Sequence, residues 1–331
     1  MYMSSSNVVI KGNLVYLNVS GSWYVYDKAQ SPIGSGAMGT VYHGSMVGTN
    51  IPVAIKKVKD EYANDKSIRE RARQEASLMF RHRNLVEMLG LCESNSGTGP
   101  IYIVSKYVRG ENLDKFVKDK LFMLPREKRT KTICDMILPI FDALNYLHSN
   151  KILHMDIKPS NIMVENGCNI RLMDLGIANI DRYTFATNSI MGTPKYAAPE
   201  QFGERGSKQS LDYRTDMYEL SVSIYELLCG ENPFLCNSFD DLIDRHKTLV
   251  LPYNERIPKM IIDVLRKAAH PLKSERYNNI NEFRNAFKNA IINIKPESQK
   301  TKYSNQIFYI LLITFCSIIF FALILAIIHI L

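Results

Sequence analysis

Recognisable cysteine pairs are missing from this chain of 331 residues, which argues against a zinc-binding protein and against a disulfide-stabilised secreted one. The six cysteines form no C-x-x-C pair, and none stands with histidine at the spacing of zinc ligands. Because disulfide frameworks belong to oxidising compartments, unpaired thiols favour a reducing one. The N-terminus has no apolar run behind a basic start, and Tyr2 stands where N-myristoylation requires glycine. We therefore expect neither a secretory signal nor a lipid anchor, and a main domain that faces the cytoplasm.

A basic tract interleaved with aromatic side chains is also missing. The net charge of +8 could suit nucleic acid, an anionic membrane surface or phosphate ligands, or reflect only a solvated surface rich in lysine. Without such a tract we expect no nucleic-acid partner. With 46% hydrophobic residues, the chain can build one large domain, or two lobes, with a real core.

Charged side chains disappear from the last part of the sequence, because residues 307–331 contain no Asp, Glu, Lys or Arg. As a helix at ~1.5 Å per residue, this run spans roughly 37 Å, enough to cross a hydrocarbon core of about 30 Å. A buried core helix of this length would normally show a polar stripe, which the run lacks. Lys295, Lys300 and Lys302 precede it and favour the cytoplasmic side. We expect a single-pass membrane protein that contacts the lipid bilayer through this run.

The rest of the chain divides into three parts. Residues 1–27 alternate apolar and polar side chains, which predicts an N-terminal extension with a β-hairpin that covers one edge of the following sheet. Residues 28–292 form the main domain, and the polar, lysine-rich residues 293–306 read as a linker. In the main domain, strand signals surround one helix at about residues 66–81, and helical patterns follow from about residue 108. This order predicts an α+β fold in which a small β-rich lobe and a larger helical lobe enclose a cleft.

A glycine-rich turn opens the main domain, at Gly34-Ser35-Gly36-Ala37-Met38-Gly39-Thr40-Val41. Glycine lets a backbone approach phosphate oxygens closely, with its amides directed at the charge. A similar turn occurs in dinucleotide-binding folds, but those continue into a helix. Here the residues after the turn continue as a strand, so a dinucleotide fold is disfavoured.

A lysine on the next strand and a glutamate on the next helix have the pattern of an ion pair. In Val53-Ala54-Ile55-Lys56, Ala54 and Lys56 share one face of the strand, so alanine can cover a flat base while lysine reaches phosphates. An ordinary strand whose lysine extends to solvent gives the same pattern. Glu75 lies on the apolar face of the helix, where an unpaired carboxylate is costly, and Lys56 is its natural partner.

Later motifs occur in the order found in one family. His154-Met155-Asp156-Ile157-Lys158-Pro159-Ser160-Asn161 resembles a catalytic loop, Asp174-Leu175-Gly176 a magnesium-binding motif, and residues 192–200 the end of an activation segment. Residues 28–291 resemble the eukaryotic-type (Hanks-type) serine/threonine protein kinases. The proline inside a helical run, Pro139, is similar to a feature of the bacterial members of this family. The resemblance implies the bilobal protein kinase fold, with ATP and Mg²⁺, or Mn²⁺, as its small-molecule partners.

The resemblance also implies catalytic roles. Asp156 would orient the proton of the attacking hydroxyl, Lys158 would stabilise the γ-phosphate, and Thr193 would contact both side chains. Asn161 and Asp174 would hold the metal ions, since both offer the oxygen atoms that hard cations prefer.

Two further positions match structural residues of the family. Asp216 would brace the catalytic loop, and Arg276 would pair with Glu200.

The same resemblance implies a nucleotide pocket. Backbone groups of Lys106 and Val108 would meet adenine, Asn112 would reach the ribose, and the small Ser105 would leave room behind the base. The complete set of implied nucleotide contacts is Ile33, Gly34, Ser35, Gly36, Ala37, Met38, Gly39, Thr40, Val41, Ala54, Lys56, Lys106, Val108, Asn112 and Met163.

These patterns predict a membrane-anchored kinase that phosphorylates Ser and Thr hydroxyls of protein substrates. The alternatives are a membrane-anchored pseudokinase or scaffold, and a small-molecule kinase. Intact Lys56, Asp156 and Asp174 disfavour the pseudokinase, and a complete segment at 192–200 disfavours the small-molecule kinase. Met155 replaces an arginine that normally pairs with a phosphorylated activation segment, so we expect activity to depend little on such phosphorylation. Ala322 and Ala326 have the small-xxx-small spacing that can pack helices and allow dimerisation, but in an apolar run of this length such spacing is more often accidental and gives no support for a dimer.

Overall fold

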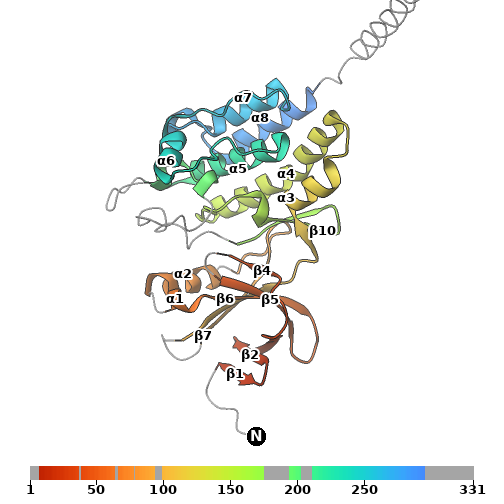
Figure 1. Ribbon diagram of the computed structural model, residues 1–331, viewed down its shortest axis with the longest axis vertical. Coiled ribbons are helices and arrows are strands. Elements are labelled where there is room, and N and C mark those ends of the chain that lie inside the picture. Colours follow the sequence, from red (N-terminus) through yellow and green to blue (C-terminus); the bar gives the residue numbers. More distant parts are fainter. Residues whose placement is uncertain are drawn as a thin grey trace, which may run out of the picture. The chain divides into compact units, whose positions relative to one another are not determined.

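The alternating N-terminal residues form three antiparallel strands in the computed structural model, which describes residues 7–36, 39–63, 66–77, 79–93, 99–174, 194–202 and 211–294. They are β1 (Val8–Lys11), β2 (Leu14–Val19) and β3 (Ser22–Asp27) (Figure 1). Gly12 in the β1–β2 turn has φ of 61°, a conformation that glycine adopts readily. The predicted hairpin is therefore confirmed, and a third strand continues it.

These strands extend an eight-stranded sheet whose order is β1-β2-β3-β5-β6-β8-β7, with β4 paired to β5. The remaining members are β4 (Gly34–Ser35), β5 (Gly39–Met46), β6 (Pro52–Val58), β7 (Met88–Glu93) and β8 (Ile101–Lys106). Each neighbouring pair of strands runs antiparallel.

The N-terminal strands cover a face of this sheet, not only an edge as the sequence predicted. Leu17 of β2 packs in one fully buried cluster with Val53 and Ile55 of β6. Val19 lies directly over Gly90 of β7, where an added Cβ would come within 2.6 Å of the Val19 Cγ1 atom. The sheet therefore curls until β2 meets β7, and its other face, which carries Ala54 and Lys56, is left for a ligand.

The helix predicted at about residues 66–81 is shorter than the sequence suggested, and its buried side chains include a charged one. The helix α2 (Lys66–Ser77) follows a short α1 (Asp60–Ala63). The amide of Met79 bonds to the Ser77 carbonyl, so the i→i−4 ladder has ended, and the Met79 side chain is exposed. Arg69 is buried instead, and with Arg73 it pairs with Glu93 of β7, which ties α2 to the sheet.

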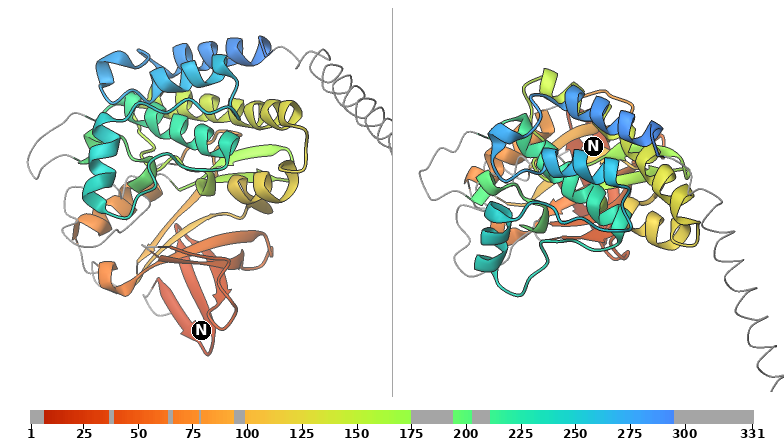
Figure 2. Two further views of the ribbon diagram at one scale, coloured as in Figure 1. Left: turned by 45° about the horizontal axis from the view of Figure 1, so that its top comes forward. Right: turned by 90° about the horizontal axis from the view of Figure 1, so that it is seen from above.

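The C-terminal lobe is mainly helical, as predicted, and Figure 2 shows its helices gathered on the side opposite the N-terminal strands. Its helices are α3 (Leu113–Phe116), α4 (Arg126–Ser149), α5 (Tyr213–Cys229), α6 (Phe239–Thr248), α7 (Lys259–Ala268) and α8 (Ile280–Ile292). A small sheet of β9 (Gly110–Asn112), β10 (Ile162–Glu165) and β11 (Asn169–Leu172) faces the N-terminal lobe.

Helix α5 is the centre of this lobe. Asp212 caps its N-terminus by accepting a hydrogen bond from the Arg214 amide, and Gly230 ends it in the left-handed conformation with φ of 87°. Almost all of its side chains are buried, and it contacts α4, α7 and α8. Buried polar side chains on such a helix can therefore form hydrogen bonds only inside the protein.

The chain divides into two compact units, Met1–Ile292 and Asn293–Leu331. No helix among the described residues is long and apolar enough to cross a membrane. The predicted span at residues 307–331 and most of the predicted linker at 293–306 lie outside the described residues.

Candidate active site

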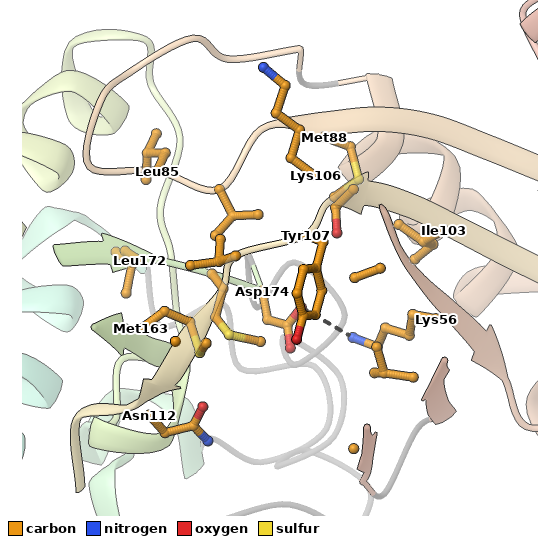
Figure 3. A pocket seen from close by; sticks show the side chains of 18 of the residues that line it. Lys56, Leu85, Met88, Ile103, Lys106, Tyr107, Asn112, Met163, Leu172 and Asp174 are labelled. Carbon is orange, nitrogen blue, oxygen red and sulfur yellow. Dashed lines mark ion pairs between the residues drawn. The ribbon is translucent and has the colours of Figure 1, made fainter. Parts of the chain in front are cut away.

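A cavity of about 280 Å³ lies between the sheet of the N-terminal lobe and the strands β9–β11 (Figure 3). Nine of the predicted nucleotide contacts line it: Ile33, Gly34, Val41, Ala54, Lys56, Lys106, Val108, Asn112 and Met163. Asp174, predicted as a metal ligand, and Ser105 line it as well. The structure therefore brings most of the predicted set to one place.

The alternation along β6 decides which side chains reach this cavity. Val53 and Ile55 are fully buried in the core behind the sheet, whereas Ala54 and Lys56 face the cavity, as the sequence predicted. The Nζ atom of Lys56 lies 3.8 Å from Oδ1 of Asp174 (Figure 3). A cation and an anion from different lobes thus meet inside the cavity. The Glu75 side chain, the predicted partner of Lys56, lies outside what the structure describes.

The strand that connects the lobes offers backbone groups to the cavity. The Lys106 amide donates to the Glu87 carbonyl at 2.9 Å, so Lys106 can present only its carbonyl to a ligand. Its ammonium group pairs with Glu87 at 2.6 Å and extends away from Lys56 (Figure 3). Asn112 and Met163 are register partners on β9 and β10, and they form the opposite wall.

The glycine-rich turn is the β4–β5 hairpin, in which Gly34 pairs with Val41. A Cβ on Gly39 would come within 2.4 Å of the Lys57 carbonyl oxygen, so this glycine is required by the close approach of β6. A Cβ on Gly36 would meet nothing within 4 Å. The two glycines therefore have different roles. Gly36 borders open space, whereas Gly39 allows β5 to lie close to β6.

Some predicted nucleotide contacts lie in this hairpin without lining the cavity, namely Ser35, Gly36, Gly39 and Thr40. Ala37 and Met38 lie outside the described residues. The role predicted for all six residues stays a prediction.

The catalytic-loop residues form one hydrogen-bonded cluster. Nζ of Lys158 lies 2.8 Å from Oδ2 of Asp156. Nδ2 of Asn161 donates to the same Oδ2 atom and to the Asp156 carbonyl, both at 2.9 Å. These two donors hold the Asp156 carboxylate in one orientation. A side chain that has to meet a substrate hydroxyl requires such a fixed orientation. Thr193, predicted to join this cluster, lies outside the described residues.

Asp216 braces the loop from α5, which confirms the prediction. Its fully buried carboxylate accepts hydrogen bonds from the amides of His154 and Met155, the latter at 2.8 Å, and from Nε2 of His148 at 2.7 Å. These bonds hold Met155 at a positive φ of 59° with its side chain buried, just before Asp156. The brace thus sets the backbone conformation from which the Asp156 side chain projects.

A neutral histidine links the loop to the metal-binding motif. Burial lowers the pKa of the fully buried His154, so its ring is uncharged at neutral pH. Its Nδ1 atom accepts a hydrogen bond from the Asp156 amide at 3.3 Å, and Nε2 is left to donate to the Met173 carbonyl at 3.1 Å. This ring therefore joins the segments that carry Asp156 and Asp174.

The second predicted structural pair is also confirmed. Arg276 meets Glu200 through two nitrogen–oxygen contacts of 2.8 and 3.0 Å, and both side chains are buried. Thr215 of α5 donates to the same carboxylate at 2.9 Å. The pair anchors residues 194–202, which follow the undescribed part of the activation segment, to the helical core.

The residues at the metal position fit a magnesium ion. Asn161 donates through Nδ2, which leaves its Oδ1 atom free to coordinate a cation, and the Asp174 carboxylate is partly exposed in the cavity. Magnesium is usually held by one or two protein oxygen ligands together with phosphates. Within the described part of the chain, no cluster of three His, Cys, Asp or Glu residues could hold a metal alone. The donors therefore suit a metal ion shared with a nucleotide.

The sequence missed much of the cavity wall. The additional lining residues are Phe80, Leu85, Val86, Met88, Ile103, Tyr107, Gly110, His154, Leu172 and Met173. Most are apolar and look like ordinary core positions along the chain. His154 belongs to the catalytic-loop motif, and Leu172 and Met173 directly precede Asp174, so their proximity to recognised residues was a signal that could have found them.

The two lobes, with Lys56 and Asp174 paired in the cavity between them, define the fold class of the protein kinases. The kinase domain of PknI from Mycobacterium tuberculosis, solved as a double mutant, aligns with a TM-score of 0.60 over 87% of this chain and 100% of that one, at 22% identity. That likeness establishes the fold. The family described as protein kinase domain matches residues 27–289, and the chain belongs to this family.

Relatives named as serine/threonine-protein kinases share this domain. PrkC of Bacillus subtilis is 31% identical over 267 residues, which cover 78% of this chain and 39% of that protein. PknB of Mycobacterium leprae is 31% identical over 262 residues, or 76% of this chain and 41% of that protein. TIO of Arabidopsis thaliana is 36% identical over 217 residues, or 65% of this chain and 15% of that protein. The chain thus spans less than half the length of these relatives.

Proposed function

We propose that this protein transfers the γ-phosphoryl group of ATP, with Mg²⁺, to Ser and Thr hydroxyls of protein substrates. The observation that carries the proposal is the cluster of Asp156, Lys158 and Asn161, joined through His154 to the segment of Asp174. Phosphoryl transfer depends on positioning and charge neutralisation, and this cluster supplies both.

Each side chain has one task in this proposal. Asp156 accepts a hydrogen bond from the substrate hydroxyl and orients it for in-line attack, while Lys158, 2.8 Å away, neutralises charge on the phosphoryl oxygens. Lys56 holds the phosphates from the other lobe. Asn161 and Asp174 hold Mg²⁺, which lowers the charge repulsion between ATP and the nucleophile. Ala54 and Met163 enclose the base from two sides.

Transfer of radiolabelled phosphate from ATP to a generic protein substrate tests the proposal. Asp156→Ala should lower turnover at least about 10²-fold while leaving nucleotide binding nearly unchanged, because Asp156 faces the hydroxyl. Lys56→Met should also impair turnover. Lys57→Met is the matched control, since Lys57 pairs with Asp60 at 3.2 Å on the other face of β6. Wild-type turnover in both active-site variants, or nucleotide binding without any transfer in the wild type, would favour a pseudokinase or scaffold.

We also infer that residues 307–331 anchor the kinase in a membrane as a single span, with the catalytic domain in the cytoplasm. The support is the uncharged run of 25 residues with lysines before it. Deleting residues 293–331 removes only the second compact unit and should release a soluble domain that still binds ATP. If the truncated protein stays with membranes after an alkaline wash, the anchor lies elsewhere.

We also propose that the activity of this kinase depends little on phosphorylation of its activation segment. Met155 is apolar and buried, so it offers no charge-assisted hydrogen bond to a phosphate. Phosphatase-treated and untreated kinase should therefore show similar turnover, and so should a variant in which Thr184, Thr187 and Ser189, which lie outside the described residues, are all changed to alanine. A large loss in either comparison would indicate that another basic residue binds the phosphate.

A further inference from the structure

Helix α5 presents three buried polar side chains to the catalytic loop, and the sequence pointed to only one of them. Asp216, Glu219 and Ser223 are spaced i, i+3 and i+7, which places them along one face of the helix. Their residues are 0%, 2% and 0% exposed. Polar groups so buried can form hydrogen bonds only within the protein, and each of these three forms them with the loop.

The two additional side chains hold one residue, Ile157. Its amide donates to Oε2 of Glu219 at 2.8 Å, and its carbonyl accepts from Oγ of Ser223 at 3.0 Å. Ile157 is fully buried and stands between Asp156 and Lys158 in the chain. Because both of its peptide groups are held, the backbone directions from which the Asp156 and Lys158 side chains leave are held as well.

Glu219 also connects the loop to the end of the activation segment. The Gln201 side chain hydrogen bonds to the Glu219 carboxyl, and its Oε1 atom accepts from the Ala198 amide. Burial, and then the charge of Asp216, raise the pKa of Glu219 well above its usual range. A buried carboxyl group that bridges two loops by hydrogen bonds is suited to positioning, because contacts on both loops hold it.

We propose that Glu219, assisted by Ser223, is a positioning residue that holds Ile157 so that Asp156 and Lys158 meet the substrate in their reactive orientation. The proposal rests on the proposed kinase activity and deepens it by assigning a second brace, separate from Asp216. Glu219 touches neither nucleotide nor hydroxyl in this arrangement. Its loss should therefore lower kcat and leave the KM for ATP nearly unchanged.

The kinetic test uses four variants of the full chain. Glu219→Met should lower kcat by about tenfold or more, since small misplacements of reacting groups have large effects. Glu219→Gln retains an oxygen for the Ile157 amide and should recover most of that loss. Ser223→Ala removes one neutral hydrogen bond and should lower kcat by about three- to tenfold. Ser221→Ala is the matched control, because the Ser221 hydroxyl is buried on the same helix without a hydrogen-bond partner among the described residues.

An exchange measurement separates this inference from the proposed activity. Amide hydrogen exchange at Ile157 should accelerate by about tenfold or more in Glu219→Met and stay unchanged in Ser221→Ala. If the wild type transfers no phosphate, the proposed function fails, and faster exchange still supports the brace. Unchanged exchange in Glu219→Met, or a kcat in both Glu219→Met and Ser223→Ala equal to that of Ser221→Ala, would overturn the proposal. Should Glu219→Met fail to fold, Ser223→Ala decides by the same two measurements.

Discussion

The buried pair of Arg276 and Glu200 yields a prediction whose magnitude can be worked from its contacts. The two side chains make two charge-assisted hydrogen bonds, and Arg276 also donates to the carbonyls of His270, Arg214 and Pro271. Arg276→Met leaves the buried Glu200 carboxylate with only the Thr215 hydroxyl among these donors. Removing one partner of a buried pair costs about 3–5 kcal/mol, because the other charge stays desolvated.

The reverse change should be milder. In Glu200→Gln, the guanidinium keeps its three carbonyl acceptors and the glutamine oxygen can still accept one hydrogen bond, so we expect a smaller loss of stability. The double variant should lose less than the sum of the two single losses, by about 0.5–3 kcal/mol, since the two side chains interact directly. For a unit of this size, about 2 °C per kcal/mol converts the loss in Arg276→Met to roughly 6–10 °C in Tm.

Thermal and urea denaturation of the single and double variants test this reasoning. Lys259→Met provides the control, because Lys259 and Asp263 form an ion pair at 2.7 Å whose side chains are 75% and 43% exposed. Solvent screens such a pair, so its removal should leave Tm unchanged within error. If Arg276→Met unfolds at the same temperature as Lys259→Met, or if the single losses simply add, the buried pair does not stabilise the domain as argued.

Three other predictions follow from the cavity, the hairpin and the core. The small Ser105 should let the wild type use bulky N6-substituted ATP analogues and Ser105→Met should exclude them, so equal sensitivity of both to a bulky adenine-like inhibitor would show that the pocket is misplaced. Gly39→Ala should destabilise the domain by about 1–3 kcal/mol through the clash with the carbonyl of β6, whereas Gly36→Ala should preserve Tm, which thermal unfolding of the two variants would measure. Burial lowers the pKa of His246 to about 3, so its contribution to stability is complete above pH 6.5 and is lost as pH falls toward 3. At pH 5, which is 1.5 pH units below the ordinary histidine pKa of 6.5, the free energy of unfolding should be lower by about 2 kcal/mol, at about 1.36 kcal/mol per unit. Urea titrations at pH 7 and pH 5 should therefore show a smaller difference in the free energy of unfolding for His246→Gln than for the wild type.

The sequence alone determined the order of the motifs and the faces of the main strands. Alternation placed Ala54 and Lys56 on one side of β6 because successive side chains of any strand point in opposite directions. Resemblance assigned Asp216 and the pair of Arg276 and Glu200, and the structure shows the same contacts. These predictions succeeded because each depends on residue type at a set position in the chain.

Tertiary structure alone decided which distant segments cover these faces. Periodicity shows that a face is apolar, but it does not say that β2 will close over β7, or that Arg69 will be buried against Glu93. The brace by Glu219 was equally hidden, because its partner is a backbone amide and every residue except proline carries the same amide. The chemistry of a side chain is known from the sequence, whereas a hydrogen bond to the main chain depends on where the fold places that main chain.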